Sequence, residues 1–109
     1  MSKISAFHIS LSPKDAVEIL KNSDLGEIVY EEVNRVDANK QLQVLIMQKY
    51  FYRVNNKATL VIIVDDSKGE TEIRMIATAA VSGFNTGLDF GAADKYVYEV
   101  VEIMKKYSI

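Results

Sequence analysis

The chain contains no cysteine, and it uses histidine and proline only once each. Without cysteine it can form no disulfide, no thiolate metal site and no thiol nucleophile. His8 has no second histidine to join it as a zinc ligand, and one proline is too few for a proline-rich linker. These absences remove most of the catalytic and metal-binding signatures that a small protein can show.

An excess of one charge and a long apolar run are absent as well. The 13 basic and 15 acidic residues leave a formal net charge of -2, which predicts no strong attraction to nucleic acid or to an anionic membrane. The longest strongly apolar runs, residues 44–47 and 60–64, are far shorter than the roughly 20 residues that a membrane-spanning helix needs. Residues 1–11 form no signal-peptide core, so we expect a cytoplasmic protein. We also expect no cofactor, because the sequence carries no metal-binding or nucleotide-binding signature.

The length of 109 residues is typical of a single domain. A chain of this size buries roughly two thirds of the surface that its unfolded form exposes, which is enough for a core without disulfides. We therefore expect one domain over residues 1–109, with no internal repeat.

The first elements are a strand and a helix. Residues 3–11 alternate between apolar and small or polar side chains, which predicts a half-buried strand. Ser12 is a preferred helix N-cap, Pro13 suits the first helical position, and Asp15 lies near the positive end of the helix dipole. These signals predict a helix over residues 13–23.

Four strands and a second helix follow. Turn signals of Asp, Asn, Lys and Gly separate apolar segments at residues 27–36, 41–54, 58–64 and 71–81. The segment at 41–54 is apolar on both of its faces, which favours a strand inside the sheet. Residues 92–107 then show apolar positions at helical spacing, and the stripe is wide enough to predict a well-buried helix.

The order of elements predicts an α+β fold, β-α-β-β-β-β-α. Short turns between the four consecutive strands require antiparallel neighbours, and the two helices are the available cover for one sheet face. We expect about five strands packed against the long C-terminal helix, a helix-grip-like layout. Leu60, Ile62, Val64, Ile73 and Met75 should form the core. Val97, Val100 and Met104 should pack above the sheet.

Three segments resemble motifs of a small uncharacterised bacterial family, a domain of unknown function. They are Leu11-Ser12-Pro13 at the first helix, residues 49–53 in the middle, and residues 88–94, Leu-Asp-Phe-Gly-Ala-Ala-Asp, before the last helix. This chain has Phe90 where the family motif has tryptophan, and its glycine-rich stretch is diluted at residues 79–83. The resemblance implies one domain over nearly the whole chain and assigns no functional residue.

Each cluster of polar residues has a structural explanation that outweighs a functional one. Residues 65–72 gather four carboxylates, yet the spacing does not match a calcium loop and is typical of a solvated hairpin. Asp89 or Gly91 can cap the last helix, with Asp94 in its first turn; anion binding there is the alternative. Residues 49–53 mix basic and aromatic side chains, as some RNA-binding strands do, but aromatic residues also simply favour strands.

Three functional hypotheses remain, and none of them is carried by a motif. The first is a non-enzymatic binding or interaction domain that forms a homo-oligomer, with a dimer as the first guess, because apolar residues lie on both faces of two strands. The second is a pocket for a small apolar or aromatic ligand between the sheet and the C-terminal helix. The expected pocket residues are Tyr50, Tyr52, Met75, Phe84 and Phe90. An enzyme that uses Tyr, Asp or Arg from that pocket is the third.

The segment at residues 83–91 is the expected rim of any functional cleft. Its glycines cluster, and it joins the last strand to the buried helix. Phe84 and Phe90 should fold inward, because a loop that exposed both would leave an apolar patch in water. A crossover whose phenylalanines only plug the end of the sheet is the alternative.

Overall fold

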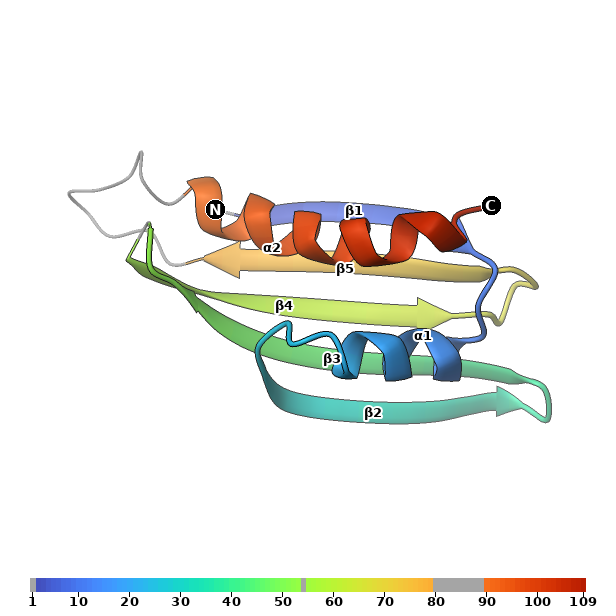
Figure 1. Ribbon diagram of the computed structural model, residues 1–109. Helices are drawn as coiled ribbons and strands as arrows, with labels where there is room; N and C mark the ends of the chain where they lie inside the picture. The colour runs from blue at the N-terminus through green and yellow to red at the C-terminus, as the bar shows by residue number, and fades with distance from the viewer. Residues whose placement is uncertain (1, 54, 80–89) are drawn as a thin grey trace.

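The computed structural model describes residues 2–53, 55–79 and 90–109 (Figure 1). It confirms the predicted α+β fold and the predicted order of elements. The elements are β1 (Ser2–Ile9), α1 (Pro13–Lys21), β2 (Glu27–Asp37), β3 (Lys40–Phe51), β4 (Asn56–Asp65), β5 (Thr71–Ala79), α2 (Phe90–Met104) and the short 3-10 helix η1 (Lys105–Tyr107).

The five strands form one antiparallel sheet in the order β1-β5-β4-β3-β2. β2 to β5 make the predicted meander, in which each strand pairs with the next one along the chain. β1 pairs with β5, so the first and last strands of the sequence are neighbours (Figure 1). As a result, β1 and β2 lie at the two edges of the sheet, and β3 lies inside it, as its two apolar faces predict.

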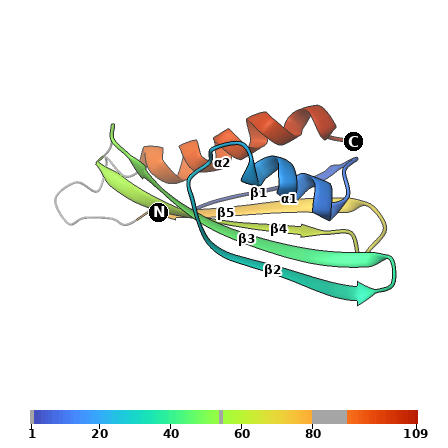
Figure 2. The same ribbon diagram turned by 60° about the horizontal axis from the view of Figure 1, so that its bottom comes forward.

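Both helices lie on the same side of the sheet, as Figure 2 shows. α1 packs on β3 and β4, whereas the longer α2 packs on β5, β4 and β1. Within the described residues, the opposite face of the sheet carries no helix. β2 extends beyond the helix layer, and all but one of its 11 residues are exposed.

The core lies between the helices and one face of the sheet. The predicted core residues Leu60, Ile62, Val64, Ile73 and Met75 are all fully buried. From α2, the buried side chains include Tyr96, Val97, Val100 and Met104, which confirms the predicted packing of this helix above the sheet.

Local chemistry explains where α1 begins. The Ser12 hydroxyl accepts a hydrogen bond from the backbone N–H of Asp15 at 3.2 Å, and Pro13 occupies the first turn. The helix ends at Lys21, two residues before the predicted end. Asp24 and Gly26, with φ of 54° and 134°, then turn the chain into β2.

β3 ends at Phe51 instead of continuing to residue 54 as predicted. Asn55 has a φ of 51°, and its N–H donates to the Tyr52 carbonyl oxygen at 3.2 Å. Because Asn tolerates this left-handed conformation, the β3–β4 turn takes in Tyr52 and Arg53. Similarly, α2 ends at Met104, and the predicted last turn is the 3-10 helix η1.

None of the helices in the described ranges is long and apolar enough to cross a membrane.

The C-terminal tail covers one end of the outer edge of β1. The N–H of Ser10 donates to the Tyr107 carbonyl oxygen at 2.8 Å, and the N–H of Ile109 donates to the His8 carbonyl oxygen at 3.1 Å. An isolated bridge joins Ile9 to Ser108. The chain thereby occupies part of the hydrogen-bonding edge of β1.

Candidate functional site

The sheet face that carries no helix, named the open face below, presents a row of apolar side chains across all five strands. The strand register places these residues side by side, one from each strand in sheet order: Ile4, Ile76, Val61, Ile46 and Tyr30. The two ends of the row are well exposed, Ile4 at 66% and Tyr30 at 48%, and the three central side chains are partly exposed. This row is named the apolar row.

A second row lies next to the apolar row and is partly apolar. In the same strand order it contains Ala6, Arg74, Ile63, Val44 and Glu32. The rows beyond these two are mostly polar, with Thr59 and Gln48 on one side and Asp65 and Glu72 on the other. The open face therefore has an apolar centre and polar ends.

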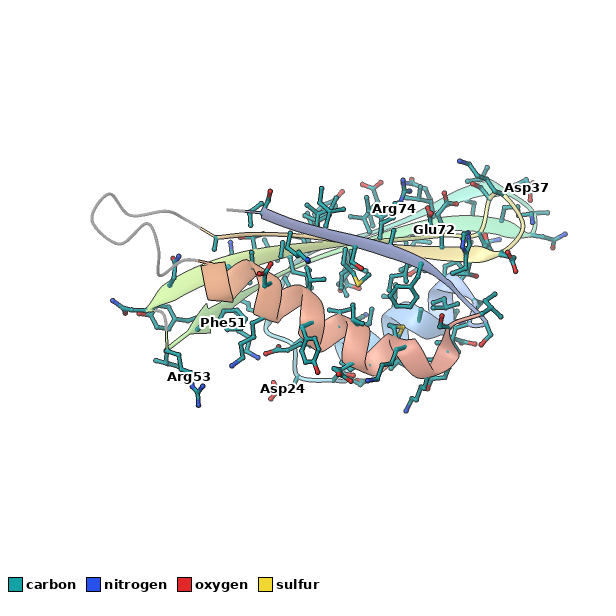
Figure 3. All side chains as sticks on the ribbon, turned by 90° about the horizontal axis from the view of Figure 1, so that it is seen from above. Asp24, Asp37, Phe51, Arg53, Glu72 and Arg74 are labelled. Atoms are coloured by element: carbon teal, nitrogen blue, oxygen red, sulfur yellow. The ribbon has the colours of Figure 1, made fainter. Side chains whose placement is uncertain are left out.

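Arg74 is the one arginine on the open face, and two carboxylates lie close to it. Its Nη2 lies 3.9 Å from Asp65 Oδ2, and its Nε lies 3.4 Å from Glu72 Oε1. The Nε–H is buried and makes no hydrogen bond to any described residue. Figure 3 shows Arg74 on the side of the sheet away from α2. The guanidinium group thus faces two carboxylates but is incompletely hydrogen-bonded.

Asp65 and Glu32 are both held as carboxylates. The pKa of Asp65 is lowered, first by the hydrogen bond from the Ser67 backbone N–H and further by the nearby Arg74 charge. The pKa of Glu32 is lowered by hydrogen bonds from the Tyr30 hydroxyl, at 2.5 Å, and from the Asn34 amide. Both groups therefore carry their charge at neutral pH, Glu32 at the β2 edge of the open face and Asp65 at one of its polar ends.

The open face approaches the size of one side of a standard protein interface. Strands about 4.8 Å apart, and same-face residues about 6.8 Å apart along each strand, give a face of about 24 by 27 Å over the four rows. Its projected area of about 650 Å² approaches the roughly 800 Å² that each partner buries in a standard interface. Apolar patches of this kind on a folded protein mark sites of interaction.

A second feature is a hollow between the end of β3 and the start of α2, with a volume of about 400 Å³. It is lined by Lys49, Tyr50, Phe51, Tyr52, Arg53, Gly91, Lys95 and Glu99. Lys49 Nζ lies 2.9 Å from Glu99 Oε1, which ties the sheet to the helix, and 5.4 Å from the centroid of the Phe51 ring. Figure 3 shows Phe51 and Arg53 at this end of the molecule.

Tyr96 closes the core behind this hollow. Its ring lies edge-on to Phe51 with 5.3 Å between centroids, and its side chain is fully buried. The hydroxyl has no hydrogen-bond partner among the described residues. Burial, and secondarily the Glu99 carboxylate, raise the pKa of this phenol, so Tyr96 stays protonated at neutral pH.

A family model described as a family of unknown function (DUF6054) matches residues 5–108. The chain belongs to this family. No curated protein and no solved structure matches the chain. Membership confirms the resemblance inferred from the three motif segments. Because the function of the DUF6054 family is unknown, membership assigns no activity to any residue.

The five residues predicted to line a ligand pocket fall into three groups. Tyr50 and Tyr52 lie together at the hollow, with ring centroids 4.8 Å apart, and Tyr52 is 86% exposed. Met75 is fully buried on β5 and is not among the residues that line the hollow. Phe84 lies outside the described residues, as do residues 83–89 of the predicted rim, and Phe90 is described only as the first residue of α2.

The acidic hairpin at residues 65–72 uses its carboxylates for backbone contacts. Asp65 Oδ1 accepts from the Ser67 N–H at 2.8 Å, and Asp66 Oδ1 accepts from the Gln41 N–H at 2.8 Å. No group of three or more metal-ligating side chains occurs in the described ranges. His8 is exposed beside Glu72 at the polar end of the open face.

The apolar row was only partly visible in the sequence. Alternation places Val44 and Ile46 opposite Leu45 and Met47, so the second apolar face of β3 is predictable. The neighbours of Ile46 depend on strand order and register, which one strand does not reveal. Ile4 and Ile76 join the row because β1 pairs with β5, a contact between distant parts of the chain.

Proposed function

We propose that the protein is a non-enzymatic interaction domain that self-associates, with the open face of one copy packed against the open face of a second. The observation that carries this proposal is the apolar row, which runs without a charged residue across all five strands. In a monomer the row faces water, whereas a second sheet would bury it.

A two-fold axis parallel to β4 makes the open face complementary to itself. β4 is the middle strand, so this rotation places β1 over β2 of the second copy and β5 over β3. Ile76 then faces Ile46 of the second copy, and Val61 lies at the axis opposite its own counterpart. Sheets stacked in this aligned way lie about 10 Å apart, as in β-sandwiches.

The same rotation supports the proposal through charge. It lays Arg74 over Val44 of the second copy, next to Glu32 in the neighbouring strand. A carboxylate there would complement the guanidinium group, whose Nε–H makes no hydrogen bond within the described chain. The interface would thus have an apolar centre and two symmetry-related ion pairs.

A charge at the two-fold axis tests this proposal. Val61→Glu places two carboxylates face to face in an apolar interface, so we expect the dimer to dissociate at least tenfold more readily. Tyr98→Glu is the control, because Tyr98 is 60% exposed on α2, away from the open face. Sedimentation velocity over a range of concentrations gives the mass, and circular dichroism checks the fold. A monomeric wild type, or an unchanged mass for Val61→Glu, overturns the proposal.

The hollow supports a second candidate function, the binding of a small aromatic ligand. Its volume of about 400 Å³ is within the range of small-molecule sites, and the Tyr50 and Tyr52 rings are already in contact at its wall. In a thermal-shift screen of aromatic compounds, a binder should raise the melting temperature of the wild type. Tyr52→Ala should lose that shift without losing stability, since Tyr52 is almost fully exposed.

A further inference from the structure

The outer edge of β2 is the long unpaired strand edge of the described sheet. β2 has 11 residues, and exposed apolar side chains include Val29, Val33 and Val36. The other edge, β1, is partly occupied by the C-terminal tail. A strand edge with free N–H and C=O groups is a template for another strand unless it is protected.

We infer that β2 pairs antiparallel with β2 of a second copy, centred on Val33, and so joins two sheets into one of ten strands. This interface goes beyond the open face and does not depend on it. The two-fold axis would be perpendicular to the sheet, and the helices of both copies would lie on the same side. Main-chain hydrogen bonds would supply affinity, as they do in strand addition generally.

Charge selects the register. A two-fold axis perpendicular to the sheet must pass midway between the two copies of the same residue. The reason is that residues paired across the axis have to point to the same face of the sheet. An axis at Glu31, Glu32 or Arg35 sets a charged residue against its own copy, and an axis at Tyr30 or Asn34 sets Glu31 or Arg35 opposite a valine. An axis at Val33 instead pairs Glu31 with Arg35 twice and Glu32 with Asn34 twice.

The geometry of β2 fits this register. The pairing of β2 with β3 shifts between Ile28 and Tyr30 and again between Arg35 and Asp37. β2 is therefore regular over residues 30–35, which contain most of the residues paired in the proposed β2–β2 contact. Glu31 and Arg35 lie on the helix side of the sheet, as the pairing of Glu31 with Leu45 and of Arg35 with Gln41 shows. Lys21 Nζ lies 2.8 Å from Glu31 Oε1, so a second cation from the new copy would complete a three-member network.

Disulfide trapping tests the pairing directly, because the chain has no native cysteine. In the proposed register the two Val33 Cα atoms lie about 5 Å apart, within the range of a disulfide. Two Val36 residues would lie about 20 Å apart along the strand. Val33 and Val36 are 59% and 57% exposed, so Val36→Cys is a matched control. Under mild oxidation with glutathione disulfide, Val33→Cys should form covalent dimers at least tenfold faster than Val36→Cys.

Charge reversal on the Val33→Cys background tests the register. Glu31→Arg gives two cations per strand and Arg35→Glu gives two anions, so each variant alone should form dimers at least tenfold more slowly. When the two are mixed, every pair becomes opposite in charge, and fast formation of the mixed disulfide should return. Loss of the Lys21–Glu31 contact cannot produce this pattern, because mixing does not restore that contact. Equal rates for Val33→Cys and Val36→Cys, or a mixture no faster than its components, overturn the inference.

Discussion

Gly26 and Gly69 both have positive φ, of 134° and 116°, yet their surroundings differ. A Cβ atom on Gly26 would lie 2.5 Å from the Gln48 carbonyl oxygen and 2.6 Å from the Tyr96 hydroxyl, whereas a Cβ on Gly69 would meet nothing within 4 Å. We expect Gly26→Ala to destabilise by about 3 kcal/mol, from backbone strain plus overpacking. Gly69→Ala should cost about 1 kcal/mol from strain alone. Equal unfolding midpoints in urea would contradict the close approach at Gly26.

Asp65 should make stability depend on acid pH. Its pKa is lowered from 3.8 in the folded protein, mainly by the Ser67 N–H. The carboxylate therefore contributes full stability above pH 3.8 and loses it as the pH falls through the lower folded pKa. We expect Asp65→Asn to cost about 1 kcal/mol at pH 7. The difference between the two urea curves should shrink as the pH falls below 3.8, and a difference that stays constant down to the acid limit of folding would contradict this assignment.

For single residues, the sequence predicts hydrogen bonds between near neighbours in the chain better than it predicts contacts between distant residues. The Ser12 cap is predictable because its partner, Asp15, is three residues away. The crowding at Gly26 depends on Gln48 and Tyr96, which are distant in sequence. Of the predicted pocket residues, Tyr50 and Tyr52 are two apart in sequence and do come together, although Tyr52 lies just past the end of β3. The position of Met75 depends on which face of β5 meets the helices.

Among the elements, α2 provides the test of core packing. Val100 is fully buried and Val101, the next residue, is only partly buried. Val100→Ala removes buried methyl groups and leaves a void, so it should destabilise by about 1–3 kcal/mol. Val101→Ala is the matched control and should cost less than half as much. A thermal midpoint for Val100→Ala that equals the wild-type midpoint would show that this position is not in the core.

Most element positions follow from the sequence, and most element ends do not. Apolar patterns together with turn signals identify all five strands and both helices, because both are properties of short segments. The end of β3 at Phe51 depends on the left-handed Asn55, and the prediction extended the strand into that turn. β2 is exposed on both faces although its sequence is as apolar as that of a half-covered strand, because it extends past the helix layer.

For the whole molecule, antiparallel topology and helix cover were predictable, since short turns require neighbouring strands and one face has to be covered. The apolar row was only partly predictable, because it combines the pairing of β1 and β5 with the meander. The same β1–β5 pairing makes β4 the middle strand and so places Val61 at the centre of the open face. Self-association through the open face can therefore be tested at Val61, which would face its own copy across the interface.

Cross-linking at Val61 tests that claim most directly. Val61→Cys supplies a single thiol at the proposed two-fold axis of the cysteine-free chain. The two thiols would project toward each other into the roughly 10 Å between stacked sheets, within reach of a short bismaleimide. Pairing through β2 alone would leave the two thiols about 30 Å apart, because Val61 is level with Tyr30 and therefore lies about 10 Å along the strands from the axis at Val33. That distance is beyond the reach of the reagent. Lys14→Cys, exposed on α1, is the control. We predict rapid formation of a covalent dimer by Val61→Cys and little by Lys14→Cys. Equal, slow cross-linking of both variants would contradict packing through the open face.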